Sequence, residues 1–430
     1  MNKKFTRTEQ HQIKSSDPAY QMLDQLCFAS KNLYNAANYE VRKRWIHNLK
    51  LLEAGKKHSY KHLCKNELDQ LMQQHTEYRE FPARVAQYVL IMLDRNWKGY
   101  FAAVKDYKLH PRKYRARPKM PGYLDKVAGR FPCVYSYQAV SVKGFTEFYV
   151  YDKDSEMFYY LMVSGIDGYL VTTKIPFKAI KEVRIVPHSA REYFTVEIVH
   201  EKEIKQPKLN HKHHACIDIG LNILAAITSD KPSIQPVLVN GRPLKSMNQF
   251  YNKEKARLQA CLEPGCHWSH GLARLTRKRT NKINDYLHKA STQIVEWIVS
   301  ERIGVLVIGK NGGWKQKLCL GKINNQNFTQ VPHARFIELL QYKAEQVGIE
   351  VILQEEAYTS KTSFLDLEKV RKHLKYKGRR VKRGLYVSRK YGNIHADVNG
   401  SYNTLRKAIP NAFGKGIEGV LVHPKWLCAA

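Results

Sequence analysis

Three groups of acidic residues lie in the C-terminal half of a strongly basic chain. Asp218 lies in A-C-I-D-I-G-L-N, Glu355 and Glu356 lie in V-I-L-Q-E-E-A-Y, and Asp397 lies in N-I-H-A-D-V-N-G. Each group stands at the edge of an expected strand or helix. Carboxylates are ligands that Mg²⁺ prefers, and two ions about 4 Å apart can stabilise the attacking water and the leaving oxygen of a phosphodiester. The acids therefore predict metal-dependent cleavage of a nucleic-acid backbone.

Taken singly, each acid also has an ordinary structural explanation. Asp218 near a glycine fits a turn, Asp397 fits a helix cap, and the Glu355–Glu356 pair fits a solvated strand end. An Asp within an apolar strand is costly, however, unless a cation or hydrogen bonds compensate it. The combination favours a metal site in which Asp218 bridges two ions. Asp397 would join it from the first turn of a closing helix, where the helix dipole favours an acid.

The charge balance predicts a polyanionic partner. The chain has 430 residues, with 72 Lys and Arg against 38 Asp and Glu, a formal net charge of +34. Nucleic acid is the partner that this excess favours, and an anionic membrane surface is the alternative. No apolar run approaches the ~18 residues of a spanning helix. The first residues also lack the apolar stretch of a secretory signal. We expect a cytoplasmic, nucleoid-associated protein that makes no membrane contact.

The elements that must position the acids follow an N-terminal half with a different pattern. Residues 1–15 alternate mildly and could form a lone strand, and residues 17–108 have helical periodicity. Residues 130–202 are rich in aromatic and β-branched types with turn residues between them, which predicts a small antiparallel barrel or sheet. A polar joint over residues 203–214 is the preferred domain boundary.

The C-terminal half then alternates helices and strands. The expected elements are a strand with Asp218, helices at about 245–262 and 271–300, a strand at 303–309, a helix at 333–347, a strand at 349–356 and a helix near Asp397. Acids at strand ends and on a closing helix, in this order, predict an RNase H-like α/β fold.

A proline-rich basic segment precedes the predicted β region. Residues 108–123 read K-L-H-P-R-K-Y-R-A-R-P-K-M-P-G-Y, so prolines break any helix and basic residues alternate with aromatic ones. Arg112, Arg115 and Arg117 suit phosphate contact, and the tyrosines suit base stacking. A charged linker is the alternative explanation of the same pattern.

Over nearly its whole length the chain resembles TnpB, the RNA-guided nuclease of insertion sequences that is related to type V CRISPR effectors. The resemblance rests on motifs in the same order: L-C-F-A-S-K-N-L-Y-N-A-A, K-M-P-G-Y, V-N-G-R-P-L-K, I-G-K-N-G-G-W-K-Q and S-Y-N-T-L-R-K. It implies a multidomain fold of helices and strands. The implied parts are a wedge β-barrel over 1–16 and 111–210, a helical recognition lobe over 17–110, and a RuvC-like nuclease domain over 211–430 with inserted basic helices (245–300) and a basic loop (366–392).

The resemblance also implies a function and partners. A prokaryotic protein of this kind would bind a guide RNA from the transposon end and cut double-stranded target DNA with two Mg²⁺ ions, for which Mn²⁺ could substitute. A monomer is favoured. One alternative is an RNA-guided DNA-binding repressor that no longer cuts. Another is a DNA-joining transposase with its own acidic triad, which the whole-length resemblance opposes.

The middle acid departs from the family pattern. Most relatives carry a Glu at the end of the strand matching V-L-V-I-G, where this chain has Gly309 followed by Lys310 and Asn311. One branch with I-G-K-N carries E-E-x-Y-T-S-K instead. The 349–356 strand should lie beside the 303–309 strand, so a Glu at its end could reach the same metals. Glu356 is the favoured ligand and Glu355 the next, and alternation should make one of them dispensable.

A second departure concerns zinc. Many relatives have a C-x-x-C pair where this chain has Ser363 and Asp366, and the later pair is also missing. We therefore expect no zinc, with the loop held by hydrophobic packing and nucleic acid. Its basic residues Arg379, Arg380, Lys382 and Arg383 are predicted to contact RNA or DNA phosphates.

Overall fold

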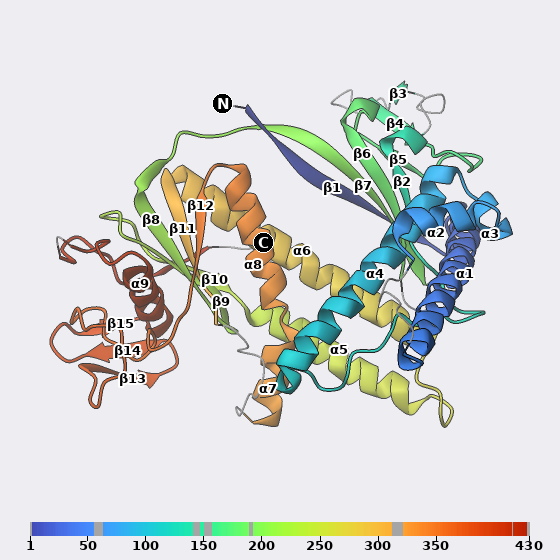
Figure 1. The fold of residues 1–430 in the computed structure, drawn as a ribbon. Helices are drawn as coiled ribbons and strands as arrows, with labels where there is room; N and C mark the ends of the chain where they lie inside the picture. Colours follow the sequence, from blue (N-terminus) through green and yellow to red (C-terminus); the bar gives the residue numbers. More distant parts are fainter. Residues whose placement is uncertain are drawn as a thin grey trace. The chain divides into compact units, whose positions relative to one another are not determined.

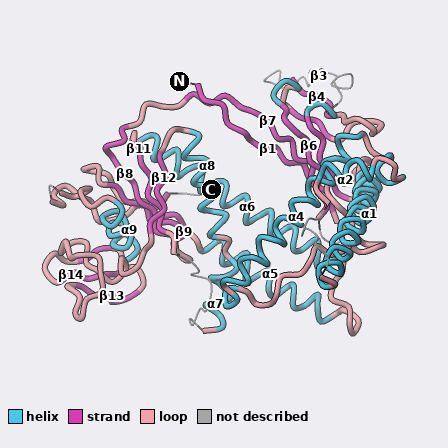
Figure 2. The backbone as a smooth tube through the Cα atoms, viewed as in Figure 1, coloured by secondary structure: helices cyan, strands magenta, loops and turns pink. Residues whose placement is uncertain are grey.

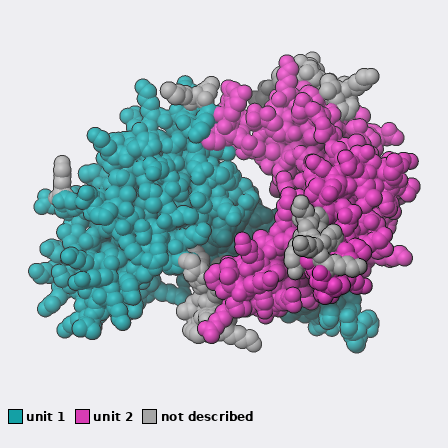
Figure 3. Space-filling model, viewed as in Figure 1, with its two compact units in different colours: residues 1–3, 204–430 teal, residues 4–203 magenta. Residues whose placement is uncertain are grey.

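A computed structural model divides the chain into two compact units, residues 4–203 and residues 1–3 with 204–430, which are described separately (Figure 3). The structure describes residues 2–55, 63–140, 147–149, 157–188, 192–311, 321–414 and 416–427. Within these ranges no helix combines the length and the apolar character that crossing a membrane requires.

Helices make up much of the unit formed by residues 4–203 (Figure 1). They are α1 (Tyr20–Glu53), α2 (Lys65–Met72), α3 (Thr76–Arg79), α4 (Ala83–Leu109) and the short 3₁₀ helices η1 (Pro111–Lys113), η2 (Tyr137–Ala139) and η3 (Phe177–Ala179). The predicted helix after Phe81 and Pro82 is confirmed as α4, with Pro82 as its N-cap residue. Its Trp97 is fully buried and donates a hydrogen bond to the Asn38 side chain of α1 at 3.0 Å.

The strands of this unit form two sheets. One has the order β1-β7-β6-β2, and the other has the order β3-β4-β5. Their bounds are β1 (Asn2–Lys14), β2 (Cys133–Ser136), β3 (Glu147–Tyr149), β4 (Met157–Leu161), β5 (Val171–Thr173), β6 (Ile180–Pro187) and β7 (Tyr193–Lys205). An isolated bridge joins Val140 to Val163, and the described strands do not close into a barrel. The N-terminal strand is present, but it pairs with β7 rather than standing alone.

The C-terminal unit is built on a six-stranded mixed sheet with the order β12-β11-β8-β9-β10-β16 (Figure 2). The strands are β8 (Asn210–Ile219), β9 (Ile223–Ser229), β10 (Val237–Asn240), β11 (Ile303–Gly309), β12 (Glu350–Gln354) and β16 (Lys425–Leu427). Strands β8, β9 and β10 form an antiparallel meander, while β11 runs parallel to β8 and β12 parallel to β11. The strand predicted to carry Asp218 therefore lies inside the sheet.

Helices and a small sheet complete this unit. The helices are α5 (Arg242–Ala260), α6 (His270–Ser300), α7 (Lys322–Gln330), α8 (His333–Gln346) and α9 (Ala396–Ala408), and β13 (Gly378–Lys382), β14 (Leu385–Ser388) and β15 (Asn393–Ile394) form the small sheet. Residues of α6 and α8 pack on one face of the six-stranded sheet, and residues of α9 pack on the other. Two apolar cores therefore enclose the sheet.

Candidate active site

Asp218 lies near the end of β8, on the face of the sheet that α9 covers. Its strand neighbours Ile217 and Ile219 point into the core under α6 and α8, so alternation directs Asp218 to the opposite face. The Ser401 hydroxyl of α9 donates a hydrogen bond to the Cys216 carbonyl at 2.9 Å, which holds the helix against this strand. A Cβ at Gly400 would lie 2.5 Å from Asp218 Oδ2, so the close approach of α9 requires a glycine there.

Glu356 reaches the same place from the neighbouring strand. Strand β12 runs parallel to β11, with Gly309 opposite Gln354, and Glu356 follows two residues later. Asn311 holds Glu356 at two points: its amide nitrogen donates to Oε2 at 3.0 Å, and its amide oxygen accepts from the Glu356 backbone N–H at 2.9 Å. The turn after β11 thus fixes both the backbone and the carboxylate of Glu356.

The carboxylate of Glu356 occupies the space that a side chain at position 309 would need. A Cβ built on Gly309 would lie 1.8 Å from Glu356 Oε1 and 2.6 Å from its Cδ. That Oε1 atom is buried and has no hydrogen-bond partner among the described residues. The missing side chain on β11 therefore makes room for an acid on β12, and it leaves one carboxylate oxygen uncompensated.

Electrostatics also indicate that two acids meet here. Burial raises the pKa of Asp218 well above its ordinary value, and the charges of Glu356 and Asp397 raise it further. Burial also raises the pKa of Glu356 to about 7, although contact with the Asp218 carboxyl opposes this shift. Carboxylates that face each other without a cation hold protons more tightly, because desolvation and like charge both disfavour their ionised forms.

Glu355 points elsewhere, as the expected alternation of the two glutamates implies. Its side chain is 57% exposed and forms an ion pair with Lys407 of α9, with Nζ 2.5 Å from Oε2. The hydrogen bond from Lys407 lowers the pKa of Glu355. Of the two candidates that the sequence left open, the structure brings Glu356 to Asp218.

Asp397 lies in the first turn of α9, as expected. The helix is capped by His395, whose Nδ1 accepts a hydrogen bond from the Asp397 backbone N–H at 3.3 Å. Its carboxylate accepts a hydrogen bond from the Arg380 guanidinium of β13 at 3.2 Å. Asp397 is near enough to raise the pKa of Asp218, but its own charge is matched by an arginine.

The donor set fits a divalent cation at two of the three acidic positions. Asp218 and Glu356 supply hard carboxylate oxygens at one point, with a buried Oε1 that lacks a partner. Within the described part of the chain, no group of three or more His, Cys, Asp and Glu side chains is arranged to hold a metal ion. The third acid, Asp397, is engaged by Arg380 instead.

The predicted nucleic-acid contacts lie on the surface. Arg379, Lys382 and Arg383 are exposed on and just after β13, and Arg380 is also exposed although it pairs with Asp397. In the other unit Arg112 belongs to η1, and Arg112, Arg115 and Arg117 are all exposed.

The loop that lacks the C-x-x-C pair is organised by hydrogen bonds. Asp366 accepts hydrogen bonds from the Ser363 hydroxyl at 2.5 Å and the Ser388 hydroxyl at 2.8 Å. Glu368 accepts the backbone N–H groups of Ser363 and Lys377, each at 3.0 Å. The hydrophobic packing expected for this loop is present, since Phe364, Leu365 and Tyr386 lie in the apolar core under α9. Two buried or half-buried acids hold the loop in addition, and the expected contact with nucleic acid stays a prediction.

Sequence reasoning missed three residues that shape the site. Asn311 was noted as a non-acid, yet it clamps Glu356. Gly400 lets α9 pack close to Asp218, and Lys407 forms an ion pair with Glu355. The I-G-K-N and S-Y-N-T-L-R-K motifs contain Asn311 and Lys407, so they were the available signal. Residues 312–316 of the first motif lie outside the described residues.

Comparison with known families gives two matches. Residues 193–315 match the family model OrfB_IS605, described as a probable transposase. Residues 333–404 match the model of the Cas12f1-like TNB domain. The second match contains Glu356 and Asp397, while Asp218 falls in the first. A search of curated proteins finds no significant match.

A search of solved structures matches nucleic-acid complexes at low identity. A Cas12f1–sgRNA–target DNA complex is 9% identical, covering 93% of this chain and 98% of that chain with a TM-score of 0.46. A CRISPR-Cas12f ternary complex is 11% identical, covering 90% and 80% with a TM-score of 0.36. Alicyclobacillus acidoterrestris C2c1 with single-guide RNA is 9% identical, covering 90% and 70% with a TM-score of 0.40.

Proposed function

We propose that this chain, a TnpB-like protein as its two family matches bear out, is an RNA-guided endonuclease that hydrolyses target DNA. The observation that carries the proposal is the meeting of Asp218 and Glu356. Asp218 comes from β8 and Glu356 from the turn after β12. Asn311 holds Glu356 by two hydrogen bonds, and Gly309 leaves room for its carboxylate. An acid pair without a function would not need Asn311 to hold one of its carboxylates, or a glycine at position 309 to make room for it.

Divalent cations are the proposed cofactors, with Mg²⁺ preferred and Mn²⁺ as a substitute. Asp218 and Glu356 would hold the first ion, and Asp397 would contribute once Arg380 is drawn away, for example by a phosphate. Bound ions of this kind activate a water and stabilise the leaving oxygen of a phosphodiester. Asn311 keeps Glu356 oriented. Gly400 has no side chain, so α9 leaves space for the Asp218 carboxylate.

The proposed partners are a guide RNA from the transposon end and double-stranded target DNA, bound by a monomer. The net charge of +34 supports polyanion binding, and the exposed Arg380 of β13 lies beside Asp397, the acid that would join the metal site. In this scheme base pairing reads the target sequence, and the protein holds the strands.

The cleavage-inactive repressor remains the second candidate, because Gly309 stands where most relatives have an acid. The structure supplies a competing explanation for that glycine, since Glu356 fills its space. A transposase that joins DNA ends is the third, and the first family match is described as a probable transposase. The three differ in their products: hydrolysed ends, an uncut complex or joined strands.

The test is cleavage of target DNA by the protein loaded with guide RNA and Mg²⁺. We expect Asp218→Ala and Glu356→Ala to slow cutting by at least about a hundredfold, as removal of a key stabilising group does. Glu355→Ala is the matched control for Glu356→Ala, and it should cut within about threefold of wild type because its partner is Lys407. DNA binding should survive in all three variants.

The opposite results are equally specific. Binding without cutting by the wild type would establish the repressor instead. Cutting that survives Asp218→Ala would remove the metal mechanism, and loss in Glu355→Ala with activity in Glu356→Ala would reverse the assignment. Joined products on the same gel would favour the transposase.

A further inference from the structure

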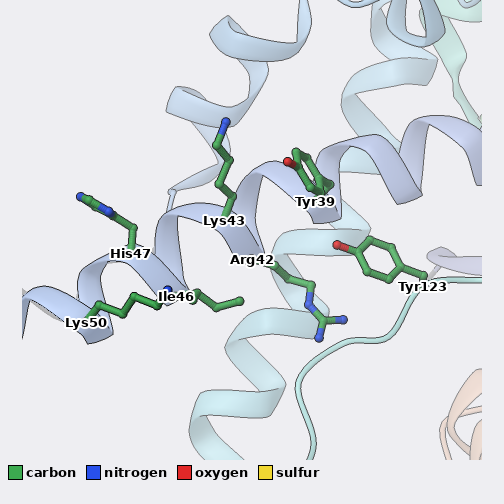
Figure 4. Close-up of a pocket in the computed structure, with 7 residues that line it drawn as sticks. All are labelled: Tyr39, Arg42, Lys43, Ile46, His47, Lys50 and Tyr123. Carbon is green, nitrogen blue, oxygen red and sulfur yellow. The ribbon is translucent and has the colours of Figure 1, made fainter. Parts of the chain in front are cut away.

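One face of α1 and a residue from a distant loop form a pocket with aromatic and basic walls. Figure 4 shows the side chains that line its volume of about 460 Å³: Tyr39, Arg42, Lys43, Ile46, His47, Lys50 and Tyr123. Six of them recur along α1 at intervals of three or four residues, so they share one side of the helix. This volume is within the range of small-ligand pockets, and all seven residues belong to the unit formed by residues 4–203.

Buried polar groups hold the loop that presents Tyr123. Asn38, which is fully buried, donates to the carbonyls of Pro121 and Gly122 at 3.1 Å each. Asn35 makes two hydrogen bonds with the Leu124 backbone, at 2.9 and 3.0 Å. Arg42 adds a hydrogen bond to the Pro121 carbonyl at 3.2 Å. The backbone on both sides of Tyr123 is thus fixed, although the ring itself is 50% exposed.

The chemistry of the walls suits an unpaired nucleotide. Tyr39 is 53% exposed, so both tyrosines offer open ring surface for stacking. The Arg42 guanidinium lies 4.9 Å from the Tyr123 ring centre, and Lys43 Nζ lies 5.9 Å from that of Tyr39. No acid is among the lining residues, while Arg42, Lys43 and Lys50 supply positive charge. Stacking surfaces beside cations bind single strands without reading their sequence.

We propose that this pocket binds an unpaired segment of the guide RNA, with one base stacked on Tyr39, another on Tyr123, and its phosphates on Lys43 and Lys50. The proposal rests on the proposed function for the identity of the RNA. RNA is favoured over target DNA because the tyrosine hydroxyls and His47 of this pocket can bond to 2′-hydroxyl groups, which DNA lacks.

The binding test uses the full-length protein with Asp218→Ala, so that cutting does not interfere, and an unstructured oligouridine as the probe. Tyr39→Ala and Tyr123→Ala should each weaken RNA binding about tenfold, the scale of one lost stacking contact. Tyr→Phe variants keep the ring and should bind within about twofold of the parent. Tyr137→Ala, which removes a tyrosine of the same unit with the same 53% exposure, is the matched control and should change nothing.

Two further measurements address the contacts directly. Replacing Lys43 and Lys50 together by Gln should reduce the slope of log affinity against log salt by about 1.4, or 0.7 for each phosphate contact of a single strand. Oligouridine containing 4-thiouridine should cross-link under ultraviolet light to peptides that contain Tyr39 or Tyr123. A structural defect would not produce those cross-links.

The results separate this inference from the proposed nuclease. Unchanged RNA binding in both Tyr→Ala variants would overturn the pocket assignment, even if the wild type cuts DNA. Loss confined to an oligothymidine probe would overturn the choice of RNA and identify a DNA strand as the occupant. RNA binding that depends on both tyrosines, in a protein that never cuts, would leave the pocket standing and remove the nuclease.

Discussion

The position of Glu356 depends on the missing side chain of Gly309 as well as on the hydrogen bonds of Asn311. Its carboxylate fills the space beside Gly309, Asn311 bonds both its backbone and its Oε2, and Oε1 has no partner among the described residues. A buried carboxylate oxygen without a partner is costly unless a proton or a cation compensates it. In the metal-free protein this cost raises the pKa of Glu356 to about 7, because burial disfavours the ionised carboxylate.

Gly309→Ala tests this arrangement at the scale of one methyl group. The new Cβ would lie 1.8 Å from Glu356 Oε1, so the carboxylate must move or the strand end must shift. We expect the rate of DNA cleavage to fall by about tenfold to a hundredfold, because a small displacement of a catalytic group slows the reaction strongly. The measurement is the single-turnover cleavage rate with saturating guide RNA and Mg²⁺.

Gly271→Ala in α6 is the control for that substitution. Its new Cβ would make only ordinary contacts, the nearest at 3.7 Å, and the rate should stay within about twofold of wild type. Wild-type cutting by Gly309→Ala would show that Glu356 is not the acid that completes the site.

The place of Asp218 among the acids that meet could be predicted from sequence, because an Asp within an apolar strand is chemically conspicuous. The choice between Glu355 and Glu356 could not, since adjacent glutamates differ only in which way the chain turns after β12. That turn depends on Asn311 and Lys407, which lie 45 and 52 residues from their partners in the chain.

At the scale of elements, apolar runs with clear ends predicted the fold well. The strand at 303–309 is confirmed as β11, and the helix at 333–347 corresponds to α8. The two units divide at the start of the polar joint at 203–214, which was the expected boundary, but the two ends of the joint belong to β7 and β8. Asn210 to His214 extend β8 alongside β11, with Val305 opposite His214, so pairing imposes a strand on residues whose polarity suggests a linker.

The small sheet β13-β14-β15 is the element that sequence could least explain, because the zinc ligands of relatives are replaced here by Ser363 and Asp366. Asp366→Ala should destabilise it, since two serine hydroxyls would lose their shared acceptor. We expect a loss of about 1–3 kcal/mol. The measurement is the rate of limited tryptic cleavage at the arginines of β13, which should rise before the rest of the unit unfolds.

Asp285→Ala is the matched control, because Asp285 is an exposed acid of α6 that forms an ion pair with Lys289 on the same helix. That substitution should change stability by less than about 0.5 kcal/mol. Equal tryptic cleavage of both variants would mean that Asp366 is not what holds the sheet.

At the scale of the whole molecule, the charge of +34 must be borne by particular surfaces rather than spread evenly. Many surface cations already face an acid, as Lys181 faces Glu201 and Lys4 faces Glu203. Arg379, Lys382 and Arg383 stand exposed on or beside β13, close in sequence to the arginine that holds Asp397. They are the cations that we expect to meet phosphates.

Replacing Arg379, Lys382 and Arg383 by Gln should therefore flatten the salt dependence of nucleic-acid binding. Each lost phosphate contact removes about 0.7–0.9 from the slope of log affinity against log salt, so the triple variant should lose about 2 to 3. Binding of the guide RNA and of target DNA would be followed from 50 to 200 mM salt, a range over which such contacts have large effects.

The control replaces Lys4, Lys181 and Lys289 by Gln, which removes the same charge from positions that already have acidic partners. Its slope should stay near that of wild type. A triple β13 variant with an unchanged slope would refute the predicted contacts.

The parallel pairing of β11 and β12 has a consequence for how relatives are judged. An alignment column at position 309 would mark this protein as a pseudoenzyme, because it compares letters along one strand. The end of β12 lies beside the end of β11, so Glu356 can occupy the space that a side chain at position 309 would fill. Under the proposed function, a list of inactive homologues drawn from that column would include active enzymes.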